Sequence, residues 1–219
     1  MNDEQTQLAC AGVLFDSDGV LVDSDASVVS AWTRWACESG LHPGPVLASV
    51  HGRPAADSVA AFLSPEAVAE GVARIGRYEV EDAAQVRALP GAGDLLASMP
   101  LGSWAVVTSA THELARARLR AARLPIPDVL VTADDVARGK PDPEGYATAA
   151  RRLGLPPAQT VVVEDAANGI QAARAAGVRY AIGVGERGRA GNPDVLIADL
   201  RALRWTGEGL AVERTARRV

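Results

Sequence analysis

The sequence Ala11-Gly-Val-Leu-Phe15 runs directly into Asp16-Ser-Asp18-Gly19, and this junction decides the fold. A short apolar run that ends abruptly in acid is typical of a buried strand that opens into a tight turn. Gly19 allows the backbone to turn sharply. Two carboxylates at the end of a buried strand cost free energy unless they bind a cation or exchange protons. The pair taken alone is also compatible with an ordinary turn, since Asp and Gly are common turn formers.

The composition is that of a globular protein without a nucleic-acid or membrane partner. The chain has 219 residues, which suits one large domain or a core with a small insert. Apolar residues make up 48% and charged residues 22%, and the formal net charge is −5. Basic residues are not concentrated in the body of the chain, and no apolar run has the length of a membrane span. We expect a monomer.

The cysteine pattern and the N-terminal residues favour a reducing compartment. Cys10 and Cys37 are the only cysteines, without the spacing of a zinc site or a disulfide framework. We expect both to be buried as small apolar residues. Residues 1–7 are polar and acidic, unlike a signal peptide, so a cytoplasmic location is the default expectation.

Strand-like and helix-like segments alternate from about residue 90 onward. The patterns predict strands at residues 104–108, 129–132, 160–164, 180–184 and 195–198, with helices at 112–123, 143–153 and 168–176 between the first four of them. Short apolar runs separated by helices are typical of crossover connections. The sequence therefore predicts an α/β fold with a doubly wound, Rossmann-like parallel sheet covered by helices on both faces.

The stretch between residues 24 and 89 differs, because it contains no convincing strand. Residues 26–38, 56–63 and 67–77 have helical patterns, and Ser64-Pro65 is typical of a helix start. We therefore predict a core of residues 1–23 and 90–219 with an all-helical cap domain, residues 24–89, inserted in it. Trp32 and Trp35 are expected to be packing anchors of this insert.

Polar residues end several of the predicted core strands. The first strand ends at Asp16, and two later strands end at Thr108-Ser109 and Glu164-Asp165. The loop Gly139-Lys140-Pro141 lies between these two segments in the chain. Because the carboxyl ends of parallel strands meet at one sheet edge, we expect these groups to converge there. Each has an ordinary interpretation alone; their joint occurrence indicates a site.

The chemistry of this set suits a metal ion and a phosphoryl group. Hard oxygen ligands from Asp16, Asp165 and Glu164 suit Mg²⁺, which keeps several of its waters. A bound phosphate could contact Thr108 and the ammonium of Lys140.

The two aspartates of the opening stretch suit different steps of one reaction. A carboxylate near a bound phosphoryl group, such as Asp16, can act as nucleophile and form an aspartyl-phosphate. Asp18 lies two residues away and could donate a proton to the leaving oxygen and later accept one from water.

Four segments together resemble the motifs of the haloacid dehalogenase superfamily. They are DSDGVLVDS at 16–24, VVTSA at 106–110, GKPDPEGY at 139–146 and VVVEDAANGIQAARAAG at 161–177. The insert resembles the small helical cap of the beta-phosphoglucomutase-like and sugar-phosphatase branch of that superfamily. The resemblance implies a Mg²⁺-dependent enzyme with this core fold.

The resemblance implies a role for each matching position. Asp16 corresponds to the nucleophile and a metal ligand; Asp18 corresponds to the general acid/base, with its backbone carbonyl as a further ligand. The remaining roles are phosphate binding by Thr108, Ser109 and Gly19, charge neutralisation by Lys140, and metal binding by Glu164 and Asp165.

Three positions separate the subclasses that this chain resembles, one in the first motif and two in the insert. Dehalogenases of this fold lack a second aspartate in the first motif, so Asp18 argues for phosphoryl transfer. Mutases of the branch carry a cap-linker histidine, where this chain has Val28, and a phosphate-gripping arginine that aligns with Ala55. Both departures weaken the mutase alternative.

A segment in the middle of the insert resembles deoxysugar and polyol phosphatases. It consists of Val50-His51-Gly52-Arg53, with Asp57 after it. We expect His51, Gly52 and Arg53 to bind substrate or phosphate. Because Arg53 could hold an anion, a mutase stays an alternative.

These observations predict a phosphoric monoester hydrolase that acts on a small sugar or polyol monophosphate through an aspartyl-phosphate. The alternatives are a beta-phosphoglucomutase-like mutase and, in another class, a non-turnover phospho-switch like bacterial receiver domains, or a binding protein. The cap and Asp18 argue against a switch, because Asp18 would hasten hydrolysis of the phosphoenzyme.

Overall fold

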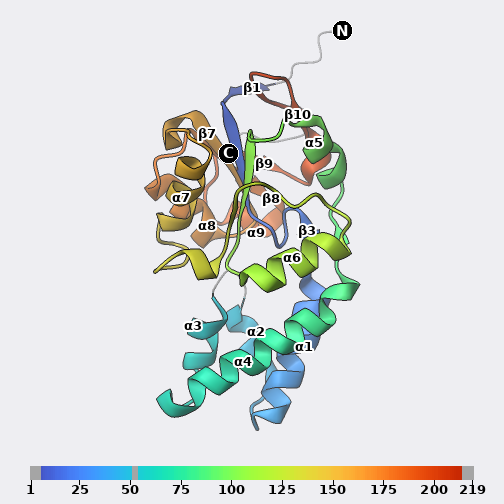
Figure 1. The fold of residues 1–219 in the computed structure, drawn as a ribbon, viewed down its shortest axis with the longest axis vertical. Coiled ribbons are helices and arrows are strands. Elements are labelled where there is room, and N and C mark those ends of the chain that lie inside the picture. Colours follow the sequence, from blue (N-terminus) through green and yellow to red (C-terminus); the bar gives the residue numbers. More distant parts are fainter. Residues whose placement is uncertain (1–5, 51–53, 214–219) are drawn as a thin grey trace.

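A six-stranded parallel sheet forms the centre of the molecule (Figure 1). The structure is a computed structural model that describes residues 6–50 and 54–213. The sheet has the order β6-β5-β2-β7-β8-β9 and is parallel throughout. Its strands are β2 (Gly12–Phe15), β5 (Trp104–Val107), β6 (Leu130–Val131), β7 (Thr160–Glu164), β8 (Tyr180–Val184) and β9 (Val195–Ile197). The predicted α/β fold class is confirmed.

Helices cover both faces of this sheet, as alternating side chains require. On β2, Val13 and Phe15 point to one face and Leu14 to the other. The first face packs on α5 (Ala92–Ser98) and α6 (His112–Ala121). The second face packs on α7 (Glu144–Arg152) and α8 (Ala167–Ala175). Burial on both faces explains why the strands read as continuous apolar runs.

The remaining elements are short. In the core, α9 (Gly185–Arg189) follows β8, and the 3-10 turns are η2 (Ala133–Asp135), η3 (Pro157–Gln159) and η4 (Leu200–Ala202). A further 3-10 turn, η1 (Ala83–Gln85), lies in the insert. The predicted helix at 112–123 ends earlier, because Arg123 adopts a left-handed conformation with φ of 56°.

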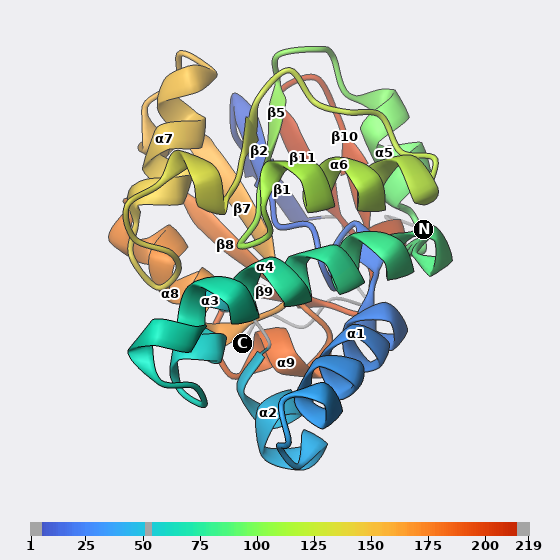
Figure 2. The same ribbon diagram turned by 60° about the horizontal axis from the view of Figure 1, so that its bottom comes forward.

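Four helices follow the first strand and form a separate layer (Figure 2). They are α1 (Asp25–Glu38), α2 (Pro43–Val50), α3 (Ala55–Ala60) and α4 (Pro65–Asp82). The chain leaves and re-enters the core through a two-residue ribbon, β3 (Val22–Asp23) and β4 (Arg87–Ala88). The expectation that residues 24–89 contain no strand was wrong for β4, which is too short to have a pattern of its own.

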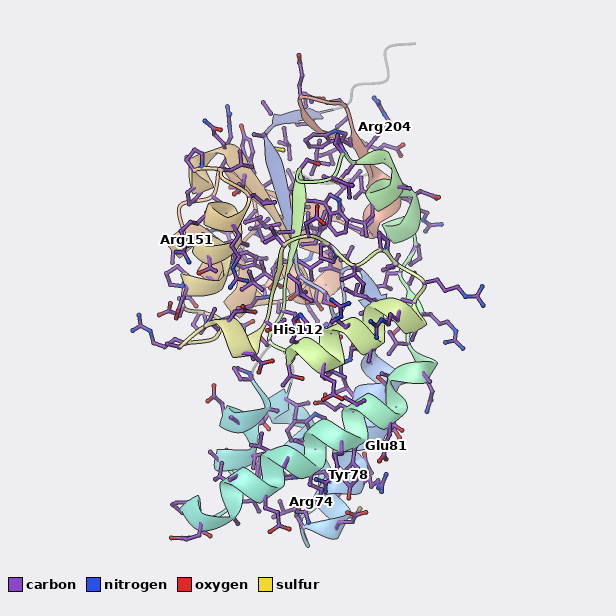
Figure 3. All side chains as sticks on the ribbon, viewed as in Figure 1. Arg74, Tyr78, Glu81, His112, Arg151 and Arg204 are labelled. Carbon is purple, nitrogen blue, oxygen red and sulfur yellow. The ribbon has the colours of Figure 1, made fainter. Side chains whose placement is uncertain are left out.

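The two tryptophans of α1 anchor this layer. Trp35 is fully buried, and its indole N–H donates to the carbonyl of Gly71 on α4 at 2.9 Å. The Trp32 and Trp35 rings meet edge to face at 5.4 Å. Arg34 adds a polar link, because its guanidinium lies over the ring of Tyr78, which Figure 3 labels on α4.

A second, antiparallel sheet joins the two ends of the described chain. β1 (Thr6–Ala9) pairs with β11 (Gly209–Val212), which pairs with β10 (Leu203–Trp205). This sheet is not predicted from the sequence, since each strand is short and β1 pairs with a strand from the opposite end of the chain.

The expected burial of the cysteines is half right. Cys10 is buried, and burial raises the pKa of its thiol to about 11. Cys37 is exposed, because it follows the buried Trp35 and Ala36 on α1 and faces the other side of the helix.

Within the described residues, no helix has both the length and the apolar character needed to cross a bilayer.

Replacing Trp35 with alanine is expected to destabilise the protein by about 3–5 kcal/mol, because it leaves a cavity between α1 and α4 and removes a hydrogen bond. Urea unfolding measures this change. Val29→Ala, on the same helix and 44% exposed, is the control and should cost less than about 1 kcal/mol. A similar loss in both variants would contradict the assigned packing role.

Candidate active site

A cavity of about 680 Å³ lies at the carboxyl edge of the parallel sheet. Its lining includes Asp16, Thr108 and Lys140 from the core and Trp32 and Asp57 from the helical insert. β2 is a central strand with neighbours on both sides, β5 and β7. The three strand ends therefore bring their polar residues to one place, as predicted.

The turn after β2 is tight and depends on Gly19. The carbonyl of Ser17 accepts backbone N–H groups from Leu21 at 2.8 Å and Val22 at 3.0 Å. Gly19 has a φ of 81°, which L side chains rarely adopt. A Cβ there would also overlap the carboxylate of Asp165. The turn thus places Asp16 and Asp18 on one rim of the cavity.

Lys140 joins two of the predicted carboxylates. Its ammonium donates to Asp16 Oδ1, to Glu164 Oε1 at 2.5 Å and to the carbonyl of Val107 at 3.3 Å. The side chain is only 6% exposed, so these ion pairs are largely shielded from water. The predicted convergence of the 139–141 loop on the sheet edge is observed.

The two acidic residues after β7 have different surroundings. Glu164 accepts from the hydroxyl of Tyr146 at 3.0 Å and from the Ala166 N–H at 2.9 Å. Asp165 instead pairs with Arg187 on α9 at 2.8 Å. Tyr146 was not predicted as a site residue, although it lies in the third of the four motifs. No sequence motif marks Arg187, because only the packing of α9 brings it to the site.

Asp18 faces a different set of groups. Thr108 Oγ1 lies 3.5 Å from Asp18 Oδ2 and accepts the Ala110 N–H at 3.1 Å. Arg118, on α6, forms ion pairs with Asp18 Oδ1 at 3.0 Å and with Glu79 of α4 at 3.0 Å. Neither Arg118 nor Glu79 was predicted as a site residue. Ser109 and Gly19 lie near the site as predicted, Ser109 on the cavity wall.

Burial and mutual repulsion shape the electrostatics of the site. Burial, partly offset by Lys140 and reinforced by Glu164 and Asp165, holds the pKa of Asp16 well above its ordinary value. Burial and Glu164 raise the pKa of Asp165 to about 6, against the opposing effect of Arg187. Burial disfavours the charged form of Lys140, but Asp16 and Glu164 outweigh it and raise the pKa of that ammonium. Each carboxylate needs a nearby cation to stay ionised.

The donor set fits a divalent metal ion. Oxygen atoms of Asp16, Glu164 and Asp165 lie within 4.8 Å of one another, and all three residues are buried. Among the described residues at this edge, Asp16, Asp18, Glu164 and Asp165 lie beside Lys140, Arg118 and Arg187, but Arg118 is shared with Glu79 and Arg187 with Asp25. The excess of negative charge, carried by hard oxygens, is what Mg²⁺ would neutralise.

The predicted substrate residues of the insert are only partly described. His51, Gly52 and Arg53 lie outside the described residues. Asp57, in the first turn of α3, lines the cavity together with Val28 and Ala55. The two positions that the resemblance to mutases singles out therefore present apolar side chains to the cavity.

Comparison with known proteins decides the family. The family model described as haloacid dehalogenase-like hydrolase matches residues 10–177, which include all four predicted motifs. The chain belongs to the haloacid dehalogenase-like hydrolases. The resemblance inferred from the motifs is confirmed.

Individual members of the family are also similar to this chain. Hexitol phosphatase A of Escherichia coli (strain K12) is 45% identical over 175 residues, 78% of this chain and 81% of that protein. Validoxylamine A 7'-phosphate phosphatase of Streptomyces hygroscopicus subsp. limoneus is 40% identical over 207 residues, 88% and 95% of the two chains. The predicted class, a phosphoric monoester hydrolase, is confirmed by the family and these relatives.

A solved structure shares the architecture. CbbY from Rhodobacter sphaeroides, crystallised in complex with phosphate, has a TM-score of 0.74 and 26% identity. The similarity covers 87% of this chain and 95% of CbbY.

Gly19→Ala is expected to lower turnover at least about tenfold, because the new methyl group would displace the Asp165 carboxylate as well as strain the backbone. Steady-state kinetics and urea unfolding measure the two effects. Gly102→Ala is a matched control, since Gly102 has a φ of 79° and a Cβ added there would meet open space. It should lose about 1–2 kcal/mol of stability and keep its turnover. Equal turnover in both variants would refute the close approach.

Proposed function

We propose that the protein is a Mg²⁺-dependent phosphatase that hydrolyses small sugar or polyol monophosphates through an aspartyl-phosphate. The observation that carries the proposal is the convergence of Asp16, Lys140, Thr108 and the Glu164-Asp165 pair on one cavity, with Asp18 beside them. Each group has a distinct task in phosphoryl transfer.

Asp16 is proposed to act as the nucleophile. A carboxylate oxygen of Asp16 would attack phosphorus, and the bond between phosphorus and the substrate oxygen would break. The ammonium of Lys140 would attract both the carboxylate and the incoming phosphate, and so hold two negative groups together. The hydroxyl of Thr108 and the backbone of Ser109 would donate hydrogen bonds to phosphoryl oxygens.

Asp18 is proposed to move the proton in both halves of the reaction. Its protonated carboxyl would give a proton to the leaving alcohol oxygen, whose alkoxide is a poor leaving group. In the second half, its carboxylate would take a proton from the water that attacks phosphorus. Cleavage of the phosphorus–oxygen bond to Asp16 would then release inorganic phosphate and restore both carboxyl groups.

Asp16 and Asp165 are proposed as direct ligands of Mg²⁺, together with Glu164 and the backbone carbonyl of Asp18. Both oxygens of Glu164 already accept hydrogen bonds, which supports Asp165 as the more accessible ligand of the two. A bound Mg²⁺ would supply charge neutralisation for the phosphoryl oxygens.

The proposed substrate class rests on the relatives and the cavity. The relatives are named for phosphorylated hexitol and validoxylamine A. Acceptor groups on the cavity wall, including Ser24, Asp25 and Asp57, could receive hydrogen bonds from substrate hydroxyls. A phosphate-release assay with hexitol, deoxyhexose and glycerol phosphates tests the class; formation of an isomer from beta-glucose 1-phosphate and its bisphosphate would support the mutase instead. A cytoplasmic location and a monomer stay predictions.

Asp16→Asn is expected to lower phosphate release at least about a hundredfold at saturating Mg²⁺, because an amide cannot form the aspartyl-phosphate. Asp23→Asn is the control, since Asp23 is an exposed aspartate of the adjoining β3. It should keep turnover close to that of the unmodified protein. Full turnover by Asp16→Asn would rule out the mechanism.

Magnesium binding is expected to weaken as the pH falls below about 6. The raised pKa of Asp165, about 6, means that protons compete with the metal for its oxygens below that pH. Asp16, another proposed ligand with a raised pKa, adds to the dependence in the same direction. Competition by the Asp165 proton alone predicts a dissociation constant about tenfold larger per pH unit below pH 6. Calorimetric Mg²⁺ titrations between pH 5 and 7 measure it, and a constant affinity over that range would contradict the prediction.

A further inference from the structure

Arg118 is the one buried cation in the described part of the site that the proposed reaction does not use. It extends from α6, on the core, and only 4% of its side chain is exposed. Figures 1 and 2 both show α6 beside α4 of the helical insert. A charged side chain is seldom buried unless it is paired. Its two partners define what it can do.

The guanidinium of Arg118 connects the insert to Asp18. Nη1 lies 3.0 Å from Asp18 Oδ1, and Nη2 lies 3.0 Å from Glu79 Oε1 on α4. Glu79 is itself buried and so shields this end of the contact from water. Because the guanidinium is a rigid planar fork, its pairing with Glu79 restricts where Nη1 can lie. The position of Asp18 is thereby linked to a residue of the insert.

Asp18 has little else to orient it. Its second oxygen, Oδ2, lies at the outer limit of hydrogen bonding to Thr108, at 3.5 Å. The contact with the Arg118 guanidinium is shorter, at 3.0 Å, and it is made by a group that is always charged. It holds Oδ1 on the side of α6 and leaves Oδ2 near Thr108, a residue proposed to hold the phosphoryl group. The Asp18 side chain is 30% exposed, and it lines the cavity.

We propose that Arg118, held by Glu79, is a positioning residue that orients Asp18 toward the leaving oxygen of the substrate. The inference rests on the proposed phosphatase function and deepens it, because it makes proton delivery dependent on a contact with the helical insert. Arg118 itself touches no reacting atom.

The test compares two substrates that differ in their need for a proton. An alkyl phosphate, such as a hexitol phosphate, must have its leaving oxygen protonated, whereas p-nitrophenyl phosphate releases a weakly basic phenolate without help. The quantity compared is kcat/KM, which reports formation of the phosphoenzyme and not its later hydrolysis. We expect Arg118→Met to lower kcat/KM at least about tenfold for the hexitol phosphate and less than about threefold for the aryl phosphate.

Two further variants separate positioning from folding. Arg118→Lys keeps one positive charge but not the fork, so it should show a smaller loss with the same preference for the aryl phosphate. Glu79→Gln should change kcat/KM for the two substrates in the same direction as Arg118→Met does. Arg120→Met is the matched control, because Arg120 is exposed on the same helix, and it should leave both values unchanged.

The outcomes are distinguishable. Equal losses on both substrates in Arg118→Met, or in Arg118→Lys if the methionine variant does not fold, would assign Arg118 a structural role and overturn the inference alone. A wild-type protein that hydrolyses neither substrate would overturn the proposed function, and the inference with it.

Discussion

The buried ammonium of Lys140, placed between Asp16 and Glu164, is the interaction on which the site depends. Without this cation, two carboxylates would face each other at the end of a sheet from which water is largely excluded. Burial, reinforced by Glu164 and Asp165, raises the pKa of Asp16 well above its ordinary value, and Lys140 opposes that rise. A protonated Asp16 could not attack phosphorus, so a permanent cation beside it is a condition of the chemistry. The remaining negative charge is what makes the site fit for a divalent metal.

The fold supplies this arrangement by placing the ends of three strands side by side in one sheet. β2 lies between β5 and β7, so the residues that follow these strands are adjacent in space although they are far apart in sequence. Helices on both sheet faces exclude water from the strands and leave the carboxyl edge as the place where polar groups can gather. The helical insert closes that edge from the other side, and its α4 carries the acid that pairs with Arg118. The core thus holds the groups proposed to react, and the insert shapes the space before them.

Features that depend on local sequence patterns could be predicted, and contacts between residues remote in sequence could not. Asp16, Thr108 and Glu164 could be predicted to meet, because each ends an apolar run and parallel strands share one edge. The burial of Trp35 followed from helical spacing. Arg118, Glu79 and Arg187 could not be predicted, since each lies on a helix among other charged residues. Only the rotation and docking of that helix decide which charge turns inward. The β1-β11-β10 sheet was missed for a related reason, as β1 finds its register only against a strand at the other end of the chain.

The sequence by itself determined the fold class, the family and the groups proposed to react, because these depend on local periodicity and on short motifs at strand ends. The tertiary structure decided which cation serves which carboxylate: Lys140 for Asp16 and Glu164, Arg187 for Asp165, and Arg118 for Asp18. The physical reason is that buried charges must be paired over a few ångströms. Distances of that size between residues remote in sequence are set by the packing of helices on the sheet and of the insert on the core.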